Sequence, residues 1–240
     1  MLNYIYGVME SSKTAQLLIQ GYNYTKAGYK VIYLKPATDT RSEDISSRIG
    51  ISHPCYTYTT SQSLIDIINR EITGIGTEEI RNLQELYDTG FQKLIDKYID
   101  KLQTTTKERI KNLLEGSLEK SVIILVDECQ FCTTEDIEFF KTLSEATGID
   151  IYCYGLKTDY KTHLFPASQR LLEIADNITE ISHICECGSK ATTNALFKEG
   201  VLQTKGPTLH IGSTEYRPLC YACYKKYLGA NKEEEKSLTT

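Results

Sequence analysis

Residues 3–14 read NYIYGVMESSKT, in which a short apolar strand, Asn3–Tyr6, runs directly into a loop that opens the first helix. Such a loop can cradle phosphate groups, because the N–H groups at a helix N-terminus point toward an anion. Gly7, Lys13 and Thr14 match the pattern G-x-x-x-x-G-K-[ST], in which the lysine reaches the terminal phosphates of a nucleotide and the hydroxyl joins a magnesium shell. The loop residues expected at the phosphates are Gly7, Met9, Ser11, Ser12, Lys13 and Thr14.

The match is imperfect at one position of this loop. Ser12 stands where the second glycine belongs, so its N–H is kept but glycine's freedom at positive φ is lost. Glu10 adds a carboxylate beside an anion site and is expected to point away from it. The loop alone does not separate a phosphate site from a chance occurrence of these residues.

A second motif, VIILVDECQF at residues 122–131, ends a continuous apolar strand with two carboxylates. At this position Asp127 is expected to hold Mg²⁺, directly or through water. Glu128 points differently and would accept the proton of an attacking hydroxyl. The alternative is an Asp-Glu pair that merely caps a strand end. A phosphate loop on a neighbouring strand of the same sheet favours the catalytic interpretation.

Strand-like and helical patterns alternate along the rest of the chain, which predicts an α/β fold with a parallel sheet covered on both faces. Further strands are expected at 30–34, 123–126 and 149–154, and helices at 15–27, 64–72, 137–147 and 169–176. Residues 77–120 break this rhythm, because their apolar residues step by threes and fours. They predict an inserted pair of helices that packs on the body or on a partner subunit. The polar tail, residues 229–240, is expected to be disordered.

Composition limits the function classes. The 240 residues are 40% hydrophobic and 25% charged, with a net charge of −5. The longest apolar run, Val122–Val126, is far shorter than a membrane span, and MLNYIYG at the N-terminus does not read as a signal peptide. Without a dense basic tract, binding to nucleic-acid backbone or anionic membrane is disfavoured. A cytosolic protein is expected.

Cysteine spacing points to a metal. Two close pairs near the C-terminus offer four thiolates, the ligand set of a structural zinc site: Cys185, Cys187, Cys220 and Cys223. The alternative is unmetallated, reduced thiols. The other cysteines, Cys55, Cys129, Cys132 and Cys153, are expected to be reduced and packed as small hydrophobic residues.

Successive segments of the chain resemble the type II thymidine kinases. Besides the loop at 7–14 and VDECQF, the resemblance rests on LKPATDTR (34–41), SSRIG (46–50), CYGLKTDY (153–160), FPASQRLLEIAD (165–176) and the cysteine pairs. It covers most of residues 1–73 and 121–228, in order, and leaves 77–120 outside. It implies a P-loop (RecA-like) kinase domain at 1–180 and a zinc-binding lasso domain at 181–228.

The resemblance also implies residue roles. It adds Asp39, Arg41 and Gln130 to the ATP site and assigns Thr14 and Asp127 to magnesium and Glu128 to the general base. An arginine there can stabilise charge on the transferring phosphoryl group. An exposed Asp39–Arg41 ion pair with no such role is the alternative. The implied nucleoside-binding residues are Met9, Phe131, Leu156, Tyr160, Phe165, His210, Ile211, Gly212 and Tyr216.

Two departures from the family affect the C-terminal region. The first cysteine pair is C-x-C where the family usually has C-x-x-C. The lasso, Gly206–Arg217, which in the family closes over the base, is one residue short and carries Ser213 in place of a glycine. Which of Leu209, His210, Ile211 and Gly212 supply the base contacts therefore stays open.

Together these features predict a homotetrameric, cytoplasmic thymidine kinase of nucleotide salvage. With ATP, Mg²⁺ and structural zinc, it would phosphorylate the 5′-hydroxyl of thymidine and of deoxyuridine. Two alternatives stay open. One is a degenerate P-loop and zinc-ribbon protein that only binds, for which Ser12 and Glu10 are the best support. The other is a kinase for another deoxynucleoside, which the shortened lasso allows.

Overall fold

The computed structural model describes residues 1–40, 42–73, 122–206 and 216–237. A six-stranded sheet forms its centre, in the order β5-β2-β6-β7-β1-β8, and its registered pairs are all parallel. The strands are β1 (Leu2–Gly7), β2 (Lys30–Pro36), β5 (Tyr56–Tyr58), β6 (Val122–Val126), β7 (Asp150–Gly155) and β8 (Asn177–Ile181). The predicted parallel α/β fold is confirmed. The predicted helical insertion at 77–120 lies outside the described residues.

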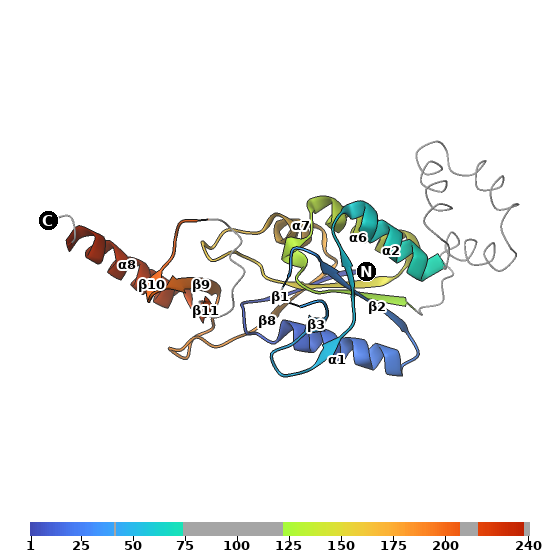
Figure 1. The fold of residues 1–240 in the computed structure, drawn as a ribbon, viewed down its shortest axis with the longest axis horizontal. Helices are drawn as coiled ribbons and strands as arrows, with labels where there is room; N and C mark the ends of the chain where they lie inside the picture. Colours follow the sequence, from blue (N-terminus) through green and yellow to red (C-terminus); the bar gives the residue numbers. More distant parts are fainter. Residues whose placement is uncertain (41, 74–121, 207–215, 238–240) are drawn as a thin grey trace, which may run out of the picture.

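Helices cover the two faces of the sheet. Helix α1 (Lys13–Lys26) lies on one face, and α2 (Ser61–Thr73), α6 (Thr134–Thr147) and α7 (Pro166–Ile174) lie on the other (Figure 1). Within β6, Ile123 and Leu125 join the core under α1, whereas Ile124 and Val126 join the core under α6 and α7. This period of two is what a strand buried on both faces requires.

Two helices begin earlier than predicted, because residues at their N-termini, which the apolar pattern does not show, set their first turns. Helix α6 begins before the predicted residue 137, because Thr133 and Asp136 form a reciprocal capping box around its first turn. The helix ends at Thr147, as predicted, and Gly148 follows it with a φ of 71°. Helix α7 likewise begins early, with Pro166 in its first turn.

A small antiparallel sheet, in the order β10-β9-β11, forms the C-terminal part of the structure, which we call the small domain. It consists of β9 (Thr193–Lys198), β10 (Val201–Leu202) and β11 (Tyr216–Leu219), and it is followed by α8 (Tyr221–Ser237). Its core contains Phe197, Leu219 and Tyr224, together with Val8 from the loop after β1. In Figure 1 this domain lies beyond one end of the large sheet. The tail expected to be disordered from residue 229 is instead helical as far as Ser237, because the segment is rich in the helix formers Lys and Glu.

One expectation about the sheet is wrong. Strand β6, which Asp127 follows directly, is not the neighbour of β1, because β7 pairs with both and lies between them. Two short strands, β3 (Ile45–Ser46) and β4 (Ser52–His53), form a separate hairpin.

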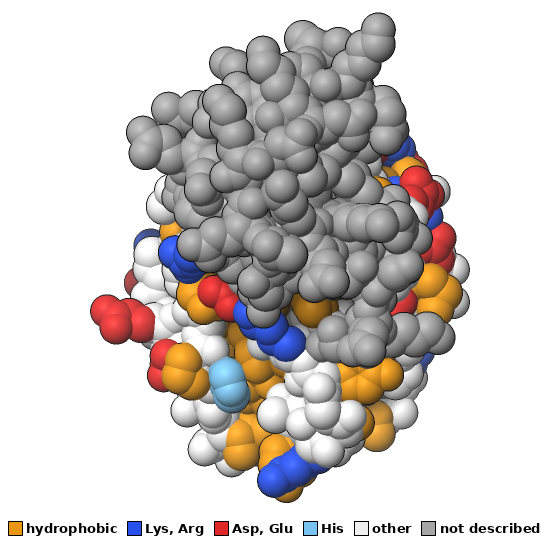
Figure 2. Space-filling view, turned by 90° about the vertical axis from the view of Figure 1, so that its right-hand side faces the viewer, with side chains coloured by type: hydrophobic (Ala, Val, Ile, Leu, Met, Phe, Trp, Pro, Cys, Tyr) orange, Lys and Arg blue, Asp and Glu red, His pale blue; other side chains and the backbone are white. Residues whose placement is uncertain are grey.

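The end of the molecule opposite α8 is seen in Figure 2, where hydrophobic and charged side chains of the described residues are interspersed. Among the described helices, none is both long enough and apolar enough to cross a membrane.

Candidate active site

The loop between β1 and α1 has a strained and closely packed backbone. Gly7 has no room for a side chain, since a Cβ there would lie 2.4 Å from Ser11 Oγ and 2.7 Å from the Ile181 carbonyl oxygen. Glu10 and Ser12 both take left-handed conformations, with φ of 65° and 62°. The N–H of Ser11 donates to the carbonyl of Val8 at 3.3 Å. The loop therefore curls tightly into α1.

Lys13 is almost fully buried inside this curl. Its Nζ donates to the Val8 carbonyl at 2.7 Å and to Ser11 Oγ at 3.4 Å. The ammonium group thus lies within the loop rather than in solvent. This is where a lysine can meet phosphate oxygens that the loop surrounds.

Thr14 joins the phosphate loop to the tip of β6. Its Oγ1 donates to Asp127 Oδ2 at 3.1 Å, although β7 separates the two strands. The contact spans that gap because Thr14 belongs to the first turn of α1, which packs against β2, β6 and β7 as well as β1. Burial, followed by the charge of Glu128, raises the pKa of Asp127 to about 7, and the bond from Thr14 opposes the shift. Two oxygen ligands of the kind that Mg²⁺ prefers therefore lie side by side.

Glu128 is held by Gln130. Glu128 has a φ of 52°, and its Oε2 accepts from Gln130 Nε2 at 2.5 Å. Gln130 Oε1 in turn accepts from the N–H of Leu156 at 2.9 Å. A side chain on Gly155 would collide with Gln130, since a Cβ there would lie 2.6 Å from its Oε1. Leu156 and Gly155 thus fix the side chain of Gln130, and Gln130 in turn orients Glu128.

One cavity of about 690 Å³ joins these groups to an apolar wall. Its volume is within the usual range for small-molecule sites. Phe131 and Phe165 meet edge to face, with ring centroids 6.1 Å apart. The cavity is lined by these predicted residues: Met9, Ser12, Lys13, Thr14, Asp39, Asp127, Glu128, Gln130, Phe131, Leu156, Tyr160, Phe165 and Tyr216.

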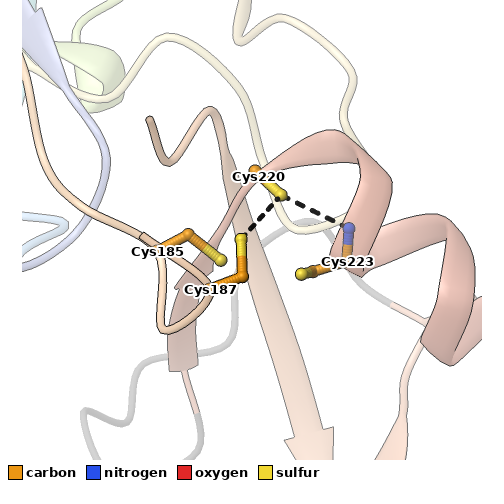
Figure 3. A group of neighbouring side chains, drawn as sticks. All are labelled: Cys185, Cys187, Cys220 and Cys223. Atoms are coloured by element: carbon orange, nitrogen blue, oxygen red, sulfur yellow. Dashed lines mark hydrogen bonds between the residues drawn. The ribbon is translucent and has the colours of Figure 1, made fainter. Parts of the chain in front are cut away.

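The four paired cysteines converge in the small domain, with their sulfurs pointing toward one another (Figure 3). The ligand atoms all lie within 4.8 Å of one another, and Cys187 Sγ lies 3.6 Å from Cys220 Sγ. A tetrahedral zinc ion bound to four sulfurs needs them about 3.8 Å apart. The C-x-C pair reaches this geometry through a tight turn, in which the N–H of Gly188 donates to the Cys185 carbonyl at 2.8 Å.

The acid–base properties of the cluster also suit a cation. Hydrogen bonds from the Ser189 backbone, and then from its hydroxyl, lower the pKa of Cys187 to about 6. The pKa of Cys223 is raised to about 12, first through its hydrogen bond with Cys187. One thiolate therefore forms readily, and further thiolates need a positive charge beside them. The cluster fits a four-sulfur zinc site.

Comparison with known proteins agrees with this geometry. The family model described as "Thymidine kinase" matches residues 1–98 and 84–224. The thymidine kinase of Legionella pneumophila (strain Lens) is 31% identical over 229 residues, which are 94% of this chain and 89% of that protein.

The chain belongs to the thymidine kinase family.

Other thymidine kinases match over similar lengths. That of Rhodopirellula baltica is 29% identical over 238 residues, which are 98% of this chain and 92% of that protein. That of Enterobacteria phage T4 is 29% identical over 223 residues, which are 91% of this chain and 92% of that protein.

Part of the implied kinase site lies outside the described residues: Arg41, His210, Ile211 and Gly212. The residues on either side of the lasso are described. Tyr160 Oη donates to the carbonyl of Lys205 at 3.1 Å, and Lys161 Nζ donates to that of Gly206 at 3.1 Å. Tyr216, at the other end, lines the cavity.

Sequence reasoning missed several residues at this kinase site. Lys35 is 1% exposed and lines the cavity, with its Nζ 3.6 Å from Asp39 Oδ2 and bonded to the carbonyl of Ser42. The sequence did offer a signal for Lys35, because it is a charged residue near the carboxyl end of a buried strand, β2. Arg48, from the β3–β4 hairpin, pairs with Glu10 at 2.5 Å, which draws the Glu10 carboxylate toward the hairpin.

The left-handed conformation of Ser12 yields a stability prediction. Ser12→Gly should raise the free energy of unfolding by about 0.5–1 kcal/mol, because only glycine takes positive φ without steric cost. No side-chain cap is lost, since the Ser12 hydroxyl does not cap α1. The thermal midpoint should rise by about 1–3 °C. The matched variant Ser12→Ala keeps a Cβ and should give no rise. Equal midpoints for the two variants would refute this explanation.

Proposed function

We propose that this chain transfers the γ-phosphoryl group of ATP to the 5′-hydroxyl of thymidine. The observation that carries the proposal is one cavity lined by Lys13, Thr14 and Asp127, by Glu128, and by the apolar wall. Phosphoryl transfer needs these groups in one cavity, because the carboxylate must reach a hydroxyl that faces the terminal phosphate. The chain's place in the thymidine kinase family supports the choice of nucleoside.

On the nucleotide side, the proposed roles follow the contacts. Lys13 would exchange its bond with the Val8 carbonyl for the β- and γ-phosphate oxygens. Thr14 and Asp127 would hold Mg²⁺, which when bound neutralises charge on the phosphates. Asp39 would keep the buried Lys35 oriented at the edge of the cavity. Arg41 stays the proposed partner of the transferring group.

On the nucleoside side, Glu128 would accept the proton of the 5′-hydroxyl as the oxygen attacks phosphorus. Both polar ends of Gln130 are engaged by Glu128 and the Leu156 amide. We therefore propose that Gln130 orients the general base, Glu128, and does not make the phosphate contact expected from the resemblance.

The thymine ring would lie against Met9, Phe131, Leu156 and Phe165, with Tyr160 and Tyr216 beside the sugar. The lasso would close over the base and supply contacts from residues 209–212. Closure matters because an open site would let water replace the sugar hydroxyl and hydrolyse ATP. Deoxyuridine, which lacks only the thymine methyl group, should also be accepted.

A nucleoside panel tests the proposed function. With MgATP, the protein should phosphorylate thymidine and deoxyuridine, and it should convert deoxycytidine at least about tenfold more slowly, because the base edges differ in donors and acceptors. The measurement is transfer of labelled phosphate to each nucleoside, with a reaction lacking nucleoside to measure ATP hydrolysis. Transfer to no nucleoside would favour the binding-protein alternative, and preference for deoxycytidine would favour the other kinase.

Three further features are proposed from the resemblance to the family. The cysteine cluster would hold one zinc ion per chain and fix the small domain beside the cavity. The protein would work in the cytoplasm and form a homotetramer. Light scattering on the purified protein tests the assembly, and a monomer at micromolar concentration would contradict it.

A further inference from the structure

Asn194 joins three parts of the molecule through one buried side chain. It lies on β9 of the small domain and is 3% exposed. Its Oδ1 accepts from the N–H of Met9 at 2.7 Å, and its Nδ2 donates to the carbonyl of Thr158 at 3.1 Å. All three residues line the cavity.

The amide has only one orientation that satisfies both neighbours. The partner from the phosphate loop is a backbone donor, and the partner from residue 158 is a backbone acceptor. A carboxamide supplies one acceptor and one donor at fixed separation, which matches this pair. Both bonds are partly buried, so leaving either backbone group without this partner would cost free energy, and the side chain therefore fixes both segments.

The two segments both line the cavity. Met9 belongs to the phosphate loop, where N–H groups usually face the anion, yet its N–H faces the small domain. Thr158 belongs to the segment between β7 and α7 that also carries Leu156, Tyr160 and Phe165 of the apolar wall. Asn194 therefore ties the phosphate loop to the segment that carries most of the apolar wall.

We propose that Asn194 is a positioning residue that holds the phosphate loop and the apolar wall at the separation needed for transfer. The inference rests on the proposed function for its consequence in catalysis, but the bond itself is independent of it. Asn194 does not touch the reacting atoms. It acts through the Val8–Met9 peptide, and through β9 it makes the geometry of the phosphate loop depend on the small domain.

The test compares Asn194→Leu and the smaller Asn194→Ser with Thr193→Val. Thr193 is the adjacent residue of β9, and its hydroxyl bonds to the Leu219 carbonyl at 2.9 Å within the small domain. The control thus removes a buried hydrogen bond from the same strand without touching the kinase domain. Zinc content and thermal midpoint show whether each variant is folded.

In both Asn194 variants, kcat for thymidine should fall about tenfold or more, because small displacements of reacting groups are costly. Amide hydrogen exchange in a peptide covering residues 7–12 should also become faster. Thr193→Val should keep wild-type kcat and exchange. A purely structural role for Asn194 would instead lower the thermal midpoint and leave kcat per folded molecule unchanged.

The outcomes separate the two proposals. The positioning role would be overturned if both Asn194 variants kept the wild-type rate of amide hydrogen exchange in residues 7–12. An equal loss of kcat in Thr193→Val would also overturn it. Wild-type protein that phosphorylates no nucleoside would overturn the proposed function. In that case, the rate of amide hydrogen exchange in residues 7–12 would still show whether Asn194 orders the phosphate loop.

Discussion

Glu128→Gln should lower kcat for thymidine by about two orders of magnitude or more, because glutamine cannot accept the proton of the attacking hydroxyl. The substitution preserves size and can keep a hydrogen bond with Gln130, whose amide lies 2.5 Å from Glu128 Oε2. The KM values for ATP and thymidine should therefore stay within about threefold of wild type. Steady-state kinetics with labelled ATP measures both effects.

A matched control for this variant is Glu173→Gln. Glu173 lies on the exposed side of α7, where it pairs with Arg170 at 2.8 Å. The same chemical change there should leave kcat unaltered. Near-normal turnover by Glu128→Gln would end the assignment of the general base, even if thymidine is the substrate. A rise in KM with unchanged kcat would instead assign Glu128 to binding.

Loss of zinc should unfold the small domain. Structural zinc binds to zinc-finger peptides with an apparent free energy of about 10–16 kcal/mol, which is comparable to the whole stability of a typical domain. Cys220→Ser removes a buried member of the cluster, whose Sγ also accepts from the N–H of Cys223. We expect wild type to carry about one zinc per chain and this variant to carry almost none. Its dissociation constant for thymidine should rise by about 100-fold or more, because the lasso then loses its attachment.

The control for the zinc experiment is Cys55→Ser. Cys55 is half-buried, belongs to the segment before β5 and is not part of the cluster. This variant should retain zinc and thymidine affinity. Elemental analysis and calorimetric titration provide the two measurements. Metal-free wild-type protein, or a Cys220→Ser variant with normal zinc and affinity, would discard the four-sulfur site.

The fold was predictable wherever structure follows from local pattern. The apolar run of β6 and the periodic helices α1 and α6 were readable, because burial on one or both faces leaves a signature in the sequence. Strand β8 was missed, since it is an edge strand that reads NITEI and is partly exposed. Strand order was not readable, because parallel pairing joins residues far apart in the chain.

The same limit explains what was missed at the site. Lys13, Asp127 and Glu128 were found because each belongs to a short motif whose neighbours constrain it. Asn194 lies in TTNALF, where a polar residue reads as ordinary strand surface. Its importance depends on a fold that brings β9 to the phosphate loop, 185 positions away in sequence. No local pattern contains that information.

The side chain of Val8 packs in the hydrophobic core of the small domain. It comes from the phosphate loop but packs with Phe197, Leu219 and Tyr224. A chain shortened to residues 1–180 would therefore leave a valine of its own nucleotide-binding loop exposed to water. Residues 1–180 should therefore be less stable alone than within the whole chain, and exchanging residues 181–240 between relatives should succeed only when this valine and its apolar neighbours are exchanged together.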